Sequence, residues 1–462
     1  MPIPNTLDTA DQTPSHPRYD AYKDSGVEWL GEIPEHWEQI KLKYISHIDS
    51  SGVWGDDPDA ADGQTPGEVI PVARVSDIGW NGEVVHEEMP PRYLGTDDVA
   101  RYSCSPGDIL VVKASGSANN IITGRSALVK KQRQFAFGNF LLRIRAGNSV
   151  ANKFLFYFIS SSWVQQGIER MVATTTYPNL NVGEYSSFAV PVPPLPEQRA
   201  IAAYLDRETE RIDTLVAKKE RLIELLEEKR TALISHAVTK GLDDDAEMTD
   251  SGVEWIGAIP AGWETTTIKW ISEITYGLSQ PPAELENGIP FLRATNISRG
   301  QILEAGMKYV DPEDVPEQRE ALLESGDLLV VRSGAYTGDS AIVSNKYDGS
   351  VAGYDMIVRV REGFSSKYLA YCFLREAFGN QVIMHSSRAA QPHLNAEELG
   401  SFSVPVPPIS KQRAIAEYLD QETEQIDTLI EKVRDGIARL KEYRTALISA
   451  AVTGRIDVRG MA

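Results

Sequence analysis

The string PVPPLPEQRAIAAYLDRETERIDTL at residues 191–215 returns as PVPPISKQRAIAEYLDQETEQIDTL at residues 405–429. A second string, DSGVEWLGEIPEHW at residues 24–37, returns as DSGVEWIGAIPAGW at residues 250–263. The sequences between these strings differ from each other far more than the strings do. A repeat this long governs the interpretation of the whole chain. The chain therefore duplicates a frame and varies the two blocks that the frame encloses.

Each copy of the longer string opens an apolar pattern with heptad spacing. The pattern falls on Ile201, Leu205, Ile212, Leu215, Leu222, Leu226 and Leu233 in the first copy, and on Ile415, Leu419, Ile426, Leu429, Val433, Leu440, Tyr443 and Leu447 in the second. Glu208, Lys219 and Lys229 interrupt the first pattern, and Glu422 and Gly436 interrupt the second. An apolar period of 3.5 residues predicts the seam of a coiled coil. The sequence PVPP, at residues 191–194 and 405–408, precedes each helix, and we call it the proline arm. Gly241 and Gly454 mark the expected ends of the two helices. Each helix should then have about 40 residues and a length of about 60 Å.

Two arrangements of these helices fit the pattern. Each could pack separately on its own domain as an ordinary amphipathic helix, or the two could pair with each other. Pairing is favoured, because helices packed on different blocks would be free to differ, whereas these two seams are nearly identical. The acidic stretch at residues 242–249 can carry the chain back, which predicts an antiparallel pair with a pseudo-two-fold axis. The string at residues 24–37 should then lie near the end of the second helix, in a circular arrangement.

The two variable blocks are distant relatives of each other. IPVARVSDI at residues 70–78 aligns with IPFLRATNI at residues 289–297, and GDILVVKASG from Gly107 aligns with GDLLVVRSGA from Gly326. Short β-rich runs, glycine turns and helices expected at residues 152–170 and 366–381 predict compact domains. The expected fold class is therefore α+β, with two globular domains separated by an antiparallel two-helix coiled coil.

Composition narrows the class of protein. The 462 residues include 42% hydrophobic side chains, which is enough for packed cores. The longest apolar runs, such as residues 109–112 and 328–331, are too short to span a membrane, and the first residues lack the pattern of a signal peptide. Cys104 and Cys372 have no cysteine or histidine cluster nearby. A cytoplasmic protein with two reduced packing thiols is therefore expected, rather than a disulfide or a metal site.

The net charge of −20 argues against a protein that coats DNA, because neutralising phosphates requires Lys and Arg. The charge is unevenly distributed. Residues 38–190 hold 14 basic and 16 acidic side chains, so this block can still carry a basic face. If the chain binds nucleic acid, we expect weak affinity alone and strong affinity together with a basic partner.

Polar side chains of the kind that read DNA bases follow several of the predicted strands. In the first block these are Arg74, Ser76, Lys113, Ser115, Asn119, Asn120, Tyr177 and Asn179; in the second they are Arg293, Thr295, Asn296, Arg332, Ser333, Tyr336, Thr337, Gln391 and His393. Arg and Lys pair with guanine edges, and Asn and Gln with adenine. Taken singly, each is more commonly a turn residue or a surface charge. Asn181 and Asn395 are predicted to be structural turn residues, and His385 and His393 lack metal-ligand spacing.

Sequence signatures of catalysis are missing. There is no GxxxxGK[ST] loop for nucleotide phosphates, no GxSxG elbow, and no [DNS]PP[YFW] string of the kind that holds a flipped base against a methyl donor. A metal-nuclease pattern such as PD…ExK is too loose to assign. These absences favour a binding protein, with no metal or cofactor of its own, over an enzyme.

The repeated strings carry a family resemblance. The duplicated SGVEW[LI]GxIPxxW, the PVPPLPEQRAIAAYLD and PVPPISKQRAIAEYLD arms and the RTALISxAVT helix ends resemble the specificity subunit of type I restriction-modification enzymes. The resemblance extends from about residue 24 to residue 455. It implies a subunit that is not itself an enzyme. Each of its two target-recognition domains would read one half of an asymmetric bipartite sequence in double-stranded DNA, and the paired helices would fix the gap between the halves.

The resemblance also implies partners and an order of domains. Two methylation subunits would bring S-adenosylmethionine and the adenine-methylating site, and restriction subunits would bring ATP, Mg and cleavage; no membrane is involved. The expected organisation is an N-terminal segment with the first frame motif (1–37), a target-recognition domain (38–190), a spacer helix (191–241), a linker with the second frame motif (242–263), a second target-recognition domain (264–404), and a second spacer helix with the C-terminus (405–462).

Two other interpretations stay open. A pure scaffold would bind proteins through its variable blocks and would leave no sequence-dependent footprint on DNA. An enzyme with an unrecognised site in one block would methylate or cleave DNA by itself.

Overall fold

The computed structural model describes residues 16–28, 30–60, 66–85, 87, 89–114, 122–130, 133–172, 179–315, 321–386 and 392–461. The chain divides into two compact units, which we call unit 1 (Met1–Lys219 with Asp435–Ala462) and unit 2 (Glu220–Arg434). Each unit holds one variable block together with a part of each of two long helices.

The long helices are α6 (Leu195–Lys240) and α11 (Ile409–Val452), and each begins directly after its proline arm. They contain 46 and 44 residues, so each is about 65–70 Å long, slightly more than the sequence predicts. Gly241 and Gly454 follow their last turns with φ angles of 78° and 74°. Such angles belong to a left-handed cap that glycine adopts without strain, which confirms the predicted helix ends.

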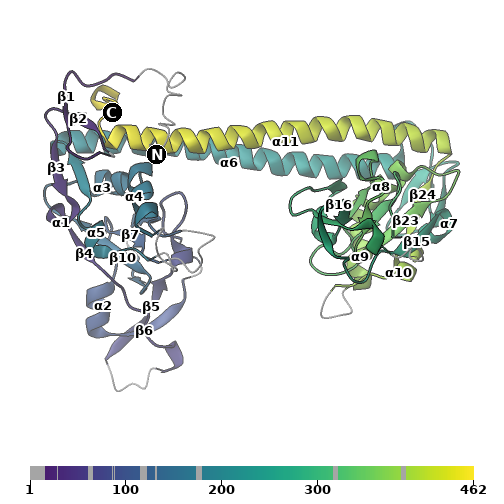
Figure 1. The fold of residues 1–462 in the computed structure, drawn as a ribbon, viewed down its shortest axis with the longest axis horizontal. Helices are drawn as coiled ribbons and strands as arrows, with labels where there is room; N and C mark the ends of the chain where they lie inside the picture. Colours follow the sequence, from purple (N-terminus) through teal and green to yellow (C-terminus); the bar gives the residue numbers. More distant parts are fainter. Residues whose placement is uncertain are drawn as a thin grey trace. The chain divides into compact units, whose positions relative to one another are not determined.

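The two helices pair in antiparallel fashion (Figure 1), and each unit supplies its own evidence. In unit 1, Arg444 Nε lies 2.9 Å from Asp213 Oδ1. In unit 2, Arg230 Nε lies 3.1 Å from Asp427 Oδ1. The two arginines are equivalent in the repeat, and so are the two aspartates. The same ion pair thus forms twice with the helices exchanging roles, which confirms the predicted antiparallel, pseudo-two-fold coiled coil.

The seam between the helices differs from the predicted heptad near its middle. Three residues placed in the seam by the sequence pattern are exposed, by 43%, 40% and 44% respectively: Leu215, Leu222 and Leu429. Their next neighbours are turned inward instead: Val216, Ile223 and Ile430. Two adjacent apolar residues fit a period of 3.5 almost equally well, so the facing helix decides which of them is buried. The predicted seam is wrong at these three positions.

The shorter repeated string folds in the same way in both units. In unit 1, β1 (Tyr22–Asp24) and β2 (Glu32–Pro34) form an antiparallel hairpin, and β3 (Glu38–Lys41) pairs with β11 (Ala189–Val192). In unit 2, β12 (Met248–Asp250) pairs with β13 (Ala258–Pro260), and β14 (Glu264–Thr267) pairs with β24 (Ser403–Val406). The chain therefore enters and leaves each block through two paired strands.

The first copy of this string lies against the end of the second long helix. A Cβ atom added to Gly454 would lie 2.3 Å from Pro34 Cδ, and Tyr22 Oη donates a hydrogen bond to Gly454 O at 3.0 Å. In unit 2, a Cβ atom added to Gly241 would lie 3.1 Å from the Trp263 ring. Both glycines thus allow a close approach as well as a helix cap. The predicted circular arrangement is confirmed.

The two blocks share one fold although their sequences differ. Unit 1 contains the sheets β4–β10–β7–β8 and β6–β5–β9, and unit 2 contains β15–β23–β20–β21 and β19–β16–β22 in matching order. The strands of the first block are β4 (Ser46–Asp49), β5 (Gly67–Ala73), β6 (Pro91–Gly95), β7 (Ile109–Val112), β8 (Ser126–Leu128), β9 (Ala136–Phe137) and β10 (Leu141–Ala146). Those of the second are β15 (Ser272–Tyr276), β16 (Glu284–Leu292), β19 (Lys308–Val310), β20 (Leu328–Val330), β21 (Ser340–Ile342), β22 (Val351–Ala352) and β23 (Met356–Val360), with the hairpin β17 (Ile297–Ser298) and β18 (Gln301–Ile302).

Short helices complete the blocks, and four of them stand where the sequence predicts only two. The first block has α1 (Leu42–Ile45), α2 (Thr96–Tyr102), α3 (Asn152–Ile159), α4 (Ser162–Val172) and α5 (Val182–Tyr185), and the second has α7 (Ile268–Ile271), α8 (Ser366–Phe373), α9 (Glu376–Ser386) and α10 (Ala396–Ser401). The helices expected at residues 152–170 and 366–381 are each broken into two. At the first break, Ser161 Oγ donates to Phe158 O at 2.6 Å, and this side-chain bond competes with the helical pattern.

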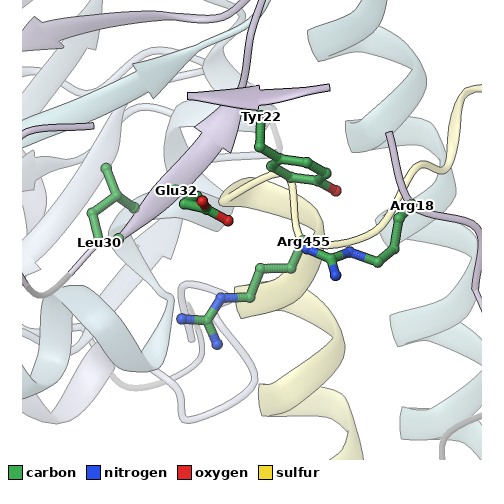
Figure 2. Close-up of a pocket in the computed structure, with 6 residues that line it drawn as sticks. Arg18, Tyr22, Leu30, Glu32 and Arg455 are labelled. Carbon is green, nitrogen blue, oxygen red and sulfur yellow. The ribbon is translucent and has the colours of Figure 1, made fainter. Parts of the chain in front are cut away.

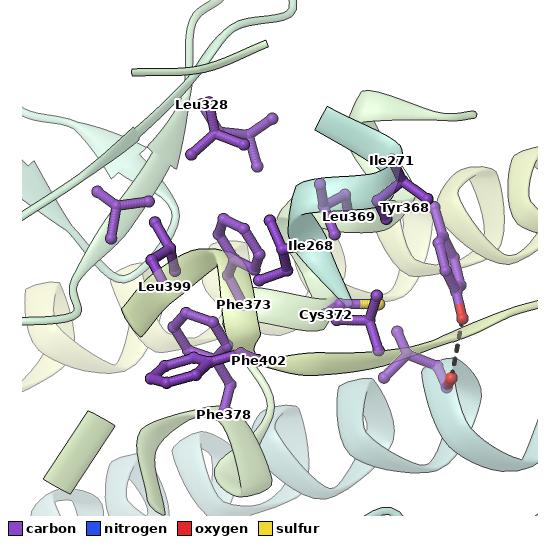
Figure 3. Close-up of a cluster of buried hydrophobic side chains, with 14 of the residues drawn as sticks. Ile268, Ile271, Leu328, Tyr368, Leu369, Cys372, Phe373, Phe378, Leu399 and Phe402 are labelled. Atoms are coloured by element: carbon purple, nitrogen blue, oxygen red, sulfur yellow. Dashed lines mark hydrogen bonds between the residues drawn. The ribbon is translucent and has the colours of Figure 1, made fainter. Parts of the chain in front are cut away.

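The main core of unit 2 joins its block to both long helices (Figure 3). It combines side chains of α6, α7, α8 and α11, among them Val238, Ile268, Leu369 and Leu419. The hydroxyl of the buried Tyr368 donates to Val238 O at 3.0 Å. The block is thus anchored to the helices by apolar burial, with the polar end of Tyr368 satisfied.

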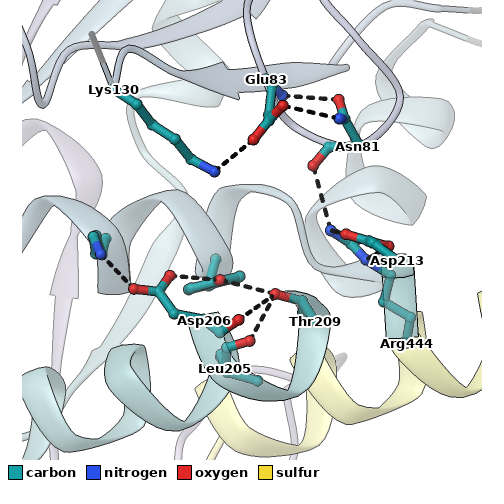
Figure 4. Close-up of polar contacts among 10 residues, drawn as sticks. Asn81, Glu83, Lys130, Leu205, Asp206, Thr209, Asp213 and Arg444 are labelled. Carbon is teal, nitrogen blue, oxygen red and sulfur yellow. Dashed lines mark hydrogen bonds and ion pairs between the residues drawn. The ribbon is translucent and has the colours of Figure 1, made fainter. Parts of the chain in front are cut away.

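Equivalent polar contacts hold each block to a long helix: the first block to α6 in unit 1 (Figure 4), and the second block to α11 in unit 2. Tyr157 Oη donates to Asp206 Oδ1 at 2.8 Å, and in unit 2 Tyr371 Oη donates to Asp420 Oδ1 at 2.8 Å. Arg444, besides pairing across the helices, donates from Nη2 to the backbone oxygen of Asn81 at 3.3 Å. The frame therefore positions each block through equivalent contacts.

Candidate nucleic-acid interface

In both blocks, the loop that follows a central strand is tied to the segment before the proline arm. Leu180 N donates to Lys113 O at 2.8 Å in unit 1, and Leu394 N donates to Arg332 O at 2.8 Å in unit 2. Lys113 follows β7 and Arg332 follows β20 by two residues, and the two are equivalent in the aligned strings. Two different basic side chains, Lys113 and Arg332, thus stand on backbone segments with the same hydrogen bond.

In unit 2 the structure brings several of the predicted site residues together. Ser333 forms an isolated antiparallel bridge with His393, and Thr337 Oγ1 donates to Pro392 O at 3.2 Å. Tyr336, in the same loop, is 53% exposed. Arg332 Nη2 lies 3.3 Å from His393 Nε2. Predicted residues from two distant stretches of sequence therefore form one surface.

Two tyrosines that the sequence analysis missed flank the arginine of this surface. The Arg332 guanidinium carbon lies 4.5 Å from the ring centroid of Tyr276 and 4.4 Å from that of Tyr354. Both rings are half-exposed, at 39% and 48%. Tyr276 ends β15 and Tyr354 comes just before β23, so their positions at strand ends were the signal that could have found them. We call Tyr276, Arg332, Tyr354 and His393 the Arg332 cluster.

A buried carboxylate lies beneath the Arg332 cluster. Asp355 is 4% exposed, and its Oδ1 accepts a hydrogen bond from Arg332 N at 3.3 Å. Burial raises the pKa of Asp355 to about 6, because the ionised form loses hydration that the bonds from the Arg332 and Ala294 backbone and the Arg332 charge only partly replace.

Asp355→Asn should raise the free energy of unfolding of unit 2 by on the order of 2 kcal/mol at pH 7.5, with a smaller gain at pH 5. The folded pKa of about 6 lies above the unfolded value, so the folded state loses stability as the pH rises from about 4 to about 6. An amide carries no such penalty. Native-state hydrogen exchange of unit 2 amides at the two pH values measures the difference. A gain of equal size at both pH values would contradict this account.

The equivalent surface of unit 1 is built differently. Lys113 Nζ donates to Ser50 O at 3.2 Å. Phe140, which precedes β10, is 63% exposed, and Asn179 is exposed and bridged to Ala114. Four other predicted residues lie outside the described residues, as does one of unit 2: Ser115, Asn119, Asn120, Tyr177 and Gln391.

The remaining predicted site residues lie in the turns that follow β5 and β16. Arg74 forms a two-pronged ion pair with Asp77, with Nε at 3.1 Å from Oδ2 and Nη2 at 3.0 Å from Oδ1. Asn296 is fully buried, and its amide donates to Leu303 O at 3.1 Å. Arg293 Nη2 donates to Gly306 O at 2.7 Å. These three side chains stabilise their own turns, whereas Ser76 and Thr295 beside them are exposed.

Asn181 and Asn395 are helix caps, which confirms their predicted structural role. The Asn181 side chain accepts from the backbone N–H groups of Gly183 and Glu184, and the Asn395 side chain accepts from that of Glu398. Both therefore begin the short helix that leads to a proline arm.

A cavity of about 280 Å³ lies elsewhere in unit 1, lined by Arg18, Tyr22, Leu30, Gly31, Glu32 and Arg455 (Figure 2). The Arg455 guanidinium lies 4.5 Å from the Trp163 ring centroid, and burial lowers the pKa of this arginine. The cavity is formed by the first hairpin and the end of α11. It therefore belongs to the frame and not to the candidate interface.

Metal and thiol chemistry find no support in the described ranges. No group of three or more His, Cys, Asp and Glu side chains there is placed to hold a metal ion. Cys104 and Cys372 are free and buried, and burial raises the pKa of both thiols, as the predicted packing role requires. Within the described part of the chain, no helix has both the length and the apolar character needed to cross a bilayer.

Comparison with known proteins agrees with the duplicated fold. The family model of the type I restriction modification DNA specificity domain matches residues 34–225 and 260–439. The type I restriction enzyme StySPI specificity subunit of Salmonella potsdam is 22% identical over 439 residues, which cover 93% of this chain and 91% of the relative. The putative MjaX specificity subunit of Methanocaldococcus jannaschii is 24% identical over 445 residues, 93% and 96% of the two chains.

A further relative and one solved structure extend the comparison. The EcoKI specificity subunit of Escherichia coli K12 is 23% identical over 364 residues, covering 77% of this chain and 76% of its own length. A chain solved in work on complex assembly and conformational transition of the type I R-M system superimposes with a TM-score of 0.66 at 19% identity, covering 91% of this chain and 98% of its own. That likeness shows a shared fold.

Proposed function

The chain belongs to the family of type I restriction-modification specificity subunits, which recognise DNA sequence, and from this premise we propose how it divides the work. Residues 38–190 and 264–404 each read one half of a bipartite site in double-stranded DNA. The long helices, within residues 191–241 and 405–462, set the gap between the half-sites. The chain recruits two methylation subunits and the restriction subunits, and it works in the cytoplasm, where it meets DNA.

One observation carries this proposal: equivalent backbone settings hold different side chains. The backbone oxygen of Lys113 accepts a hydrogen bond from Leu180 N, and that of Arg332 accepts one from the equivalent Leu394 N, both at 2.8 Å. A DNA-binding fold that must read two unrelated sequences needs a constant backbone and variable side chains, because the side chains that reach base edges carry the sequence information.

The frame supports recruitment of partners. The net charge of −20 is unfavourable for binding DNA alone, so basic partner subunits would supply much of the phosphate contact. Leu215, Leu222 and Leu429 are apolar side chains left exposed on the long helices. We assign S-adenosylmethionine, ATP and Mg to the partner subunits, and no catalytic step to this chain.

Selection from random duplex DNA tests the proposal. The full chain, together with its methylation subunits, should enrich two short conserved half-sites separated by a fixed gap. A scaffold would enrich no sequence. Methylation or cleavage of DNA by the isolated chain would instead reveal an enzyme.

Exchanging residues 38–190 for the corresponding block of another family member should change one half-site and leave the other half-site and the gap unchanged. The reason is that each block has its own sheets and core within its own unit. The same selection experiment measures this. A change in both half-sites would contradict the division of work between the blocks.

A further inference from the structure

We infer that Arg332, clamped between Tyr276 and Tyr354, reads a guanine in one half-site, and that Lys113 is the reading residue at the equivalent position of the other block. This inference rests on the proposed function and deepens it by naming a specificity-determining residue and the base that it selects.

The Arg332 cluster restricts an otherwise flexible side chain. Tyrosine rings lie 4.5 and 4.4 Å from the guanidinium carbon, and cation–π attraction to both rings lowers the mobility of the guanidinium. Most of the entropy cost of ordering a long arginine is therefore met before DNA arrives. An arginine that contacts only phosphate gains little from this restraint, because phosphates accept hydrogen bonds from many directions.

The burial of one nitrogen of Arg332 indicates which edge of its guanidinium can contact a ligand. Arg332 Nε is buried and makes no hydrogen bond with the described residues, so it lies on the inner side. Nη2 lies 3.3 Å from His393 Nε2. We take the terminal nitrogens as the edge open to a ligand, because Nε is the guanidinium nitrogen of Arg332 that is buried without a partner among the described residues, and the two nearby rings are half-exposed. Two parallel N–H groups on this edge match the O6 and N7 acceptors of guanine in the major groove.

The first block has no arginine flanked by tyrosines at the equivalent positions. Ser50 stands where Tyr276 stands in the second block, 226 residues on, and its backbone oxygen accepts from Lys113 Nζ at 3.2 Å. A lysine is a compact point charge that does not enforce a planar, two-pronged contact. The two blocks should thus differ in how strictly this position selects a base.

The test compares sequences selected from random duplex DNA by the full chain with its methylation subunits. The variants are Arg332→Met, which keeps an unbranched apolar stem and removes the guanidinium, and Lys113→Met as the matched control in the other block. Arg332→Met should reduce the preference for guanine at one position of one half-site by roughly 10- to 100-fold, with every other position unchanged. Lys113→Met should alter only the other half-site.

Replacing that guanine by 7-deazaguanine, which lacks the N7 acceptor, should weaken binding of the wild type and leave binding of Arg332→Met unchanged. Tyr354→Ala should relax the guanine preference as a positioning change, while Tyr354→Phe, which keeps the ring, should not. Circular dichroism of each variant checks that it folds.

Three results would overturn the inference. Uniform weakening across all sequences would make Arg332 a phosphate contact, and an unchanged preference would remove it from recognition. If the wild type selects no bipartite site, the proposed function itself fails. If the wild type selects such a site and Arg332→Met selects the same one, only the role of Arg332 fails.

Discussion

Inserting seven residues after Lys219 of α6 and seven after Arg434 of α11 should lengthen the preferred gap between the half-sites by about 3 base pairs. Seven helical residues add about 10 Å, and base pairs are spaced by 3.4 Å along the duplex. The two points face each other, since a Cβ atom added to Gly436 would lie 3.2 Å from Lys219 Nζ. Both half-site sequences should persist, because neither block is changed.

The length of seven follows from the seam. Val216, Ile223 and Leu226 on α6, with Ile426 and Ile430 on α11, repeat at heptad spacing, so a matched heptad keeps the apolar faces in phase. The two cross-helix ion pairs, one in each unit, are preserved as well.

An insertion of seven residues into α6 alone is the matched control. It shifts the helices past each other, so the ion pair Arg230–Asp427 and the ion pair Arg444–Asp213 cannot both form. Binding should then weaken without a new defined gap. Selection from random DNA reads out both variants, and a double insertion that leaves the gap unchanged would contradict the role of the helices as a spacer.

Glu197→Ala should lower the free energy of unfolding of unit 1 by about 3 kcal/mol, because it leaves buried donors without an acceptor. The carboxylate is 8% exposed. It accepts hydrogen bonds from Tyr19 Oη at 2.7 Å and from Trp37 Nε1 at 3.0 Å, and His36 Nε2 lies 2.8 Å from its other oxygen. Tyr19 and Trp37 are themselves buried. Native-state hydrogen exchange of unit 1 amides measures the loss.

The repeat provides a matched control for this prediction. Lys411 occupies the position equivalent to Glu197 in the second copy and is exposed. Lys411→Ala should change the stability of unit 2 by less than about 0.5 kcal/mol, as surface substitutions usually do. Equal losses from the two substitutions would show that Glu197 does not organise the first frame motif.

The frame could be predicted from the sequence because its physical determinants are local and repeated. The hairpin of β1 and β2 returns as that of β12 and β13 in identical register, and the helix-capping glycines recur at both helix ends. The pairing of the helices followed from the near-identity of the two seams, and its antiparallel direction followed from the link at residues 242–249 that carries the chain back. The phase of the seam could not be predicted, since Leu215 and Val216 fit the heptad about equally and only the facing helix separates them.

The candidate site could be predicted in part. Arg332 and His393 were expected from their residue types and from the loops in which they stand. Their meeting depends on hydrogen bonds between segments 61 residues apart, such as the contact between their side chains. Tyr276 and Tyr354 stood at strand ends, which was the available signal, but only the folded sheet reveals that their rings approach the arginine. Conversely, Asn296 has the side chain of a base reader and is buried in its own turn.

The most direct test of the central claim is a map of methylated adenines across the genome of cells that carry the methylation subunits, with and without this chain. The account predicts one bipartite motif, methylated only when the chain is present, whose two halves keep a constant gap. Identical methylation in the two strains, or a motif without two separable halves, would contradict it.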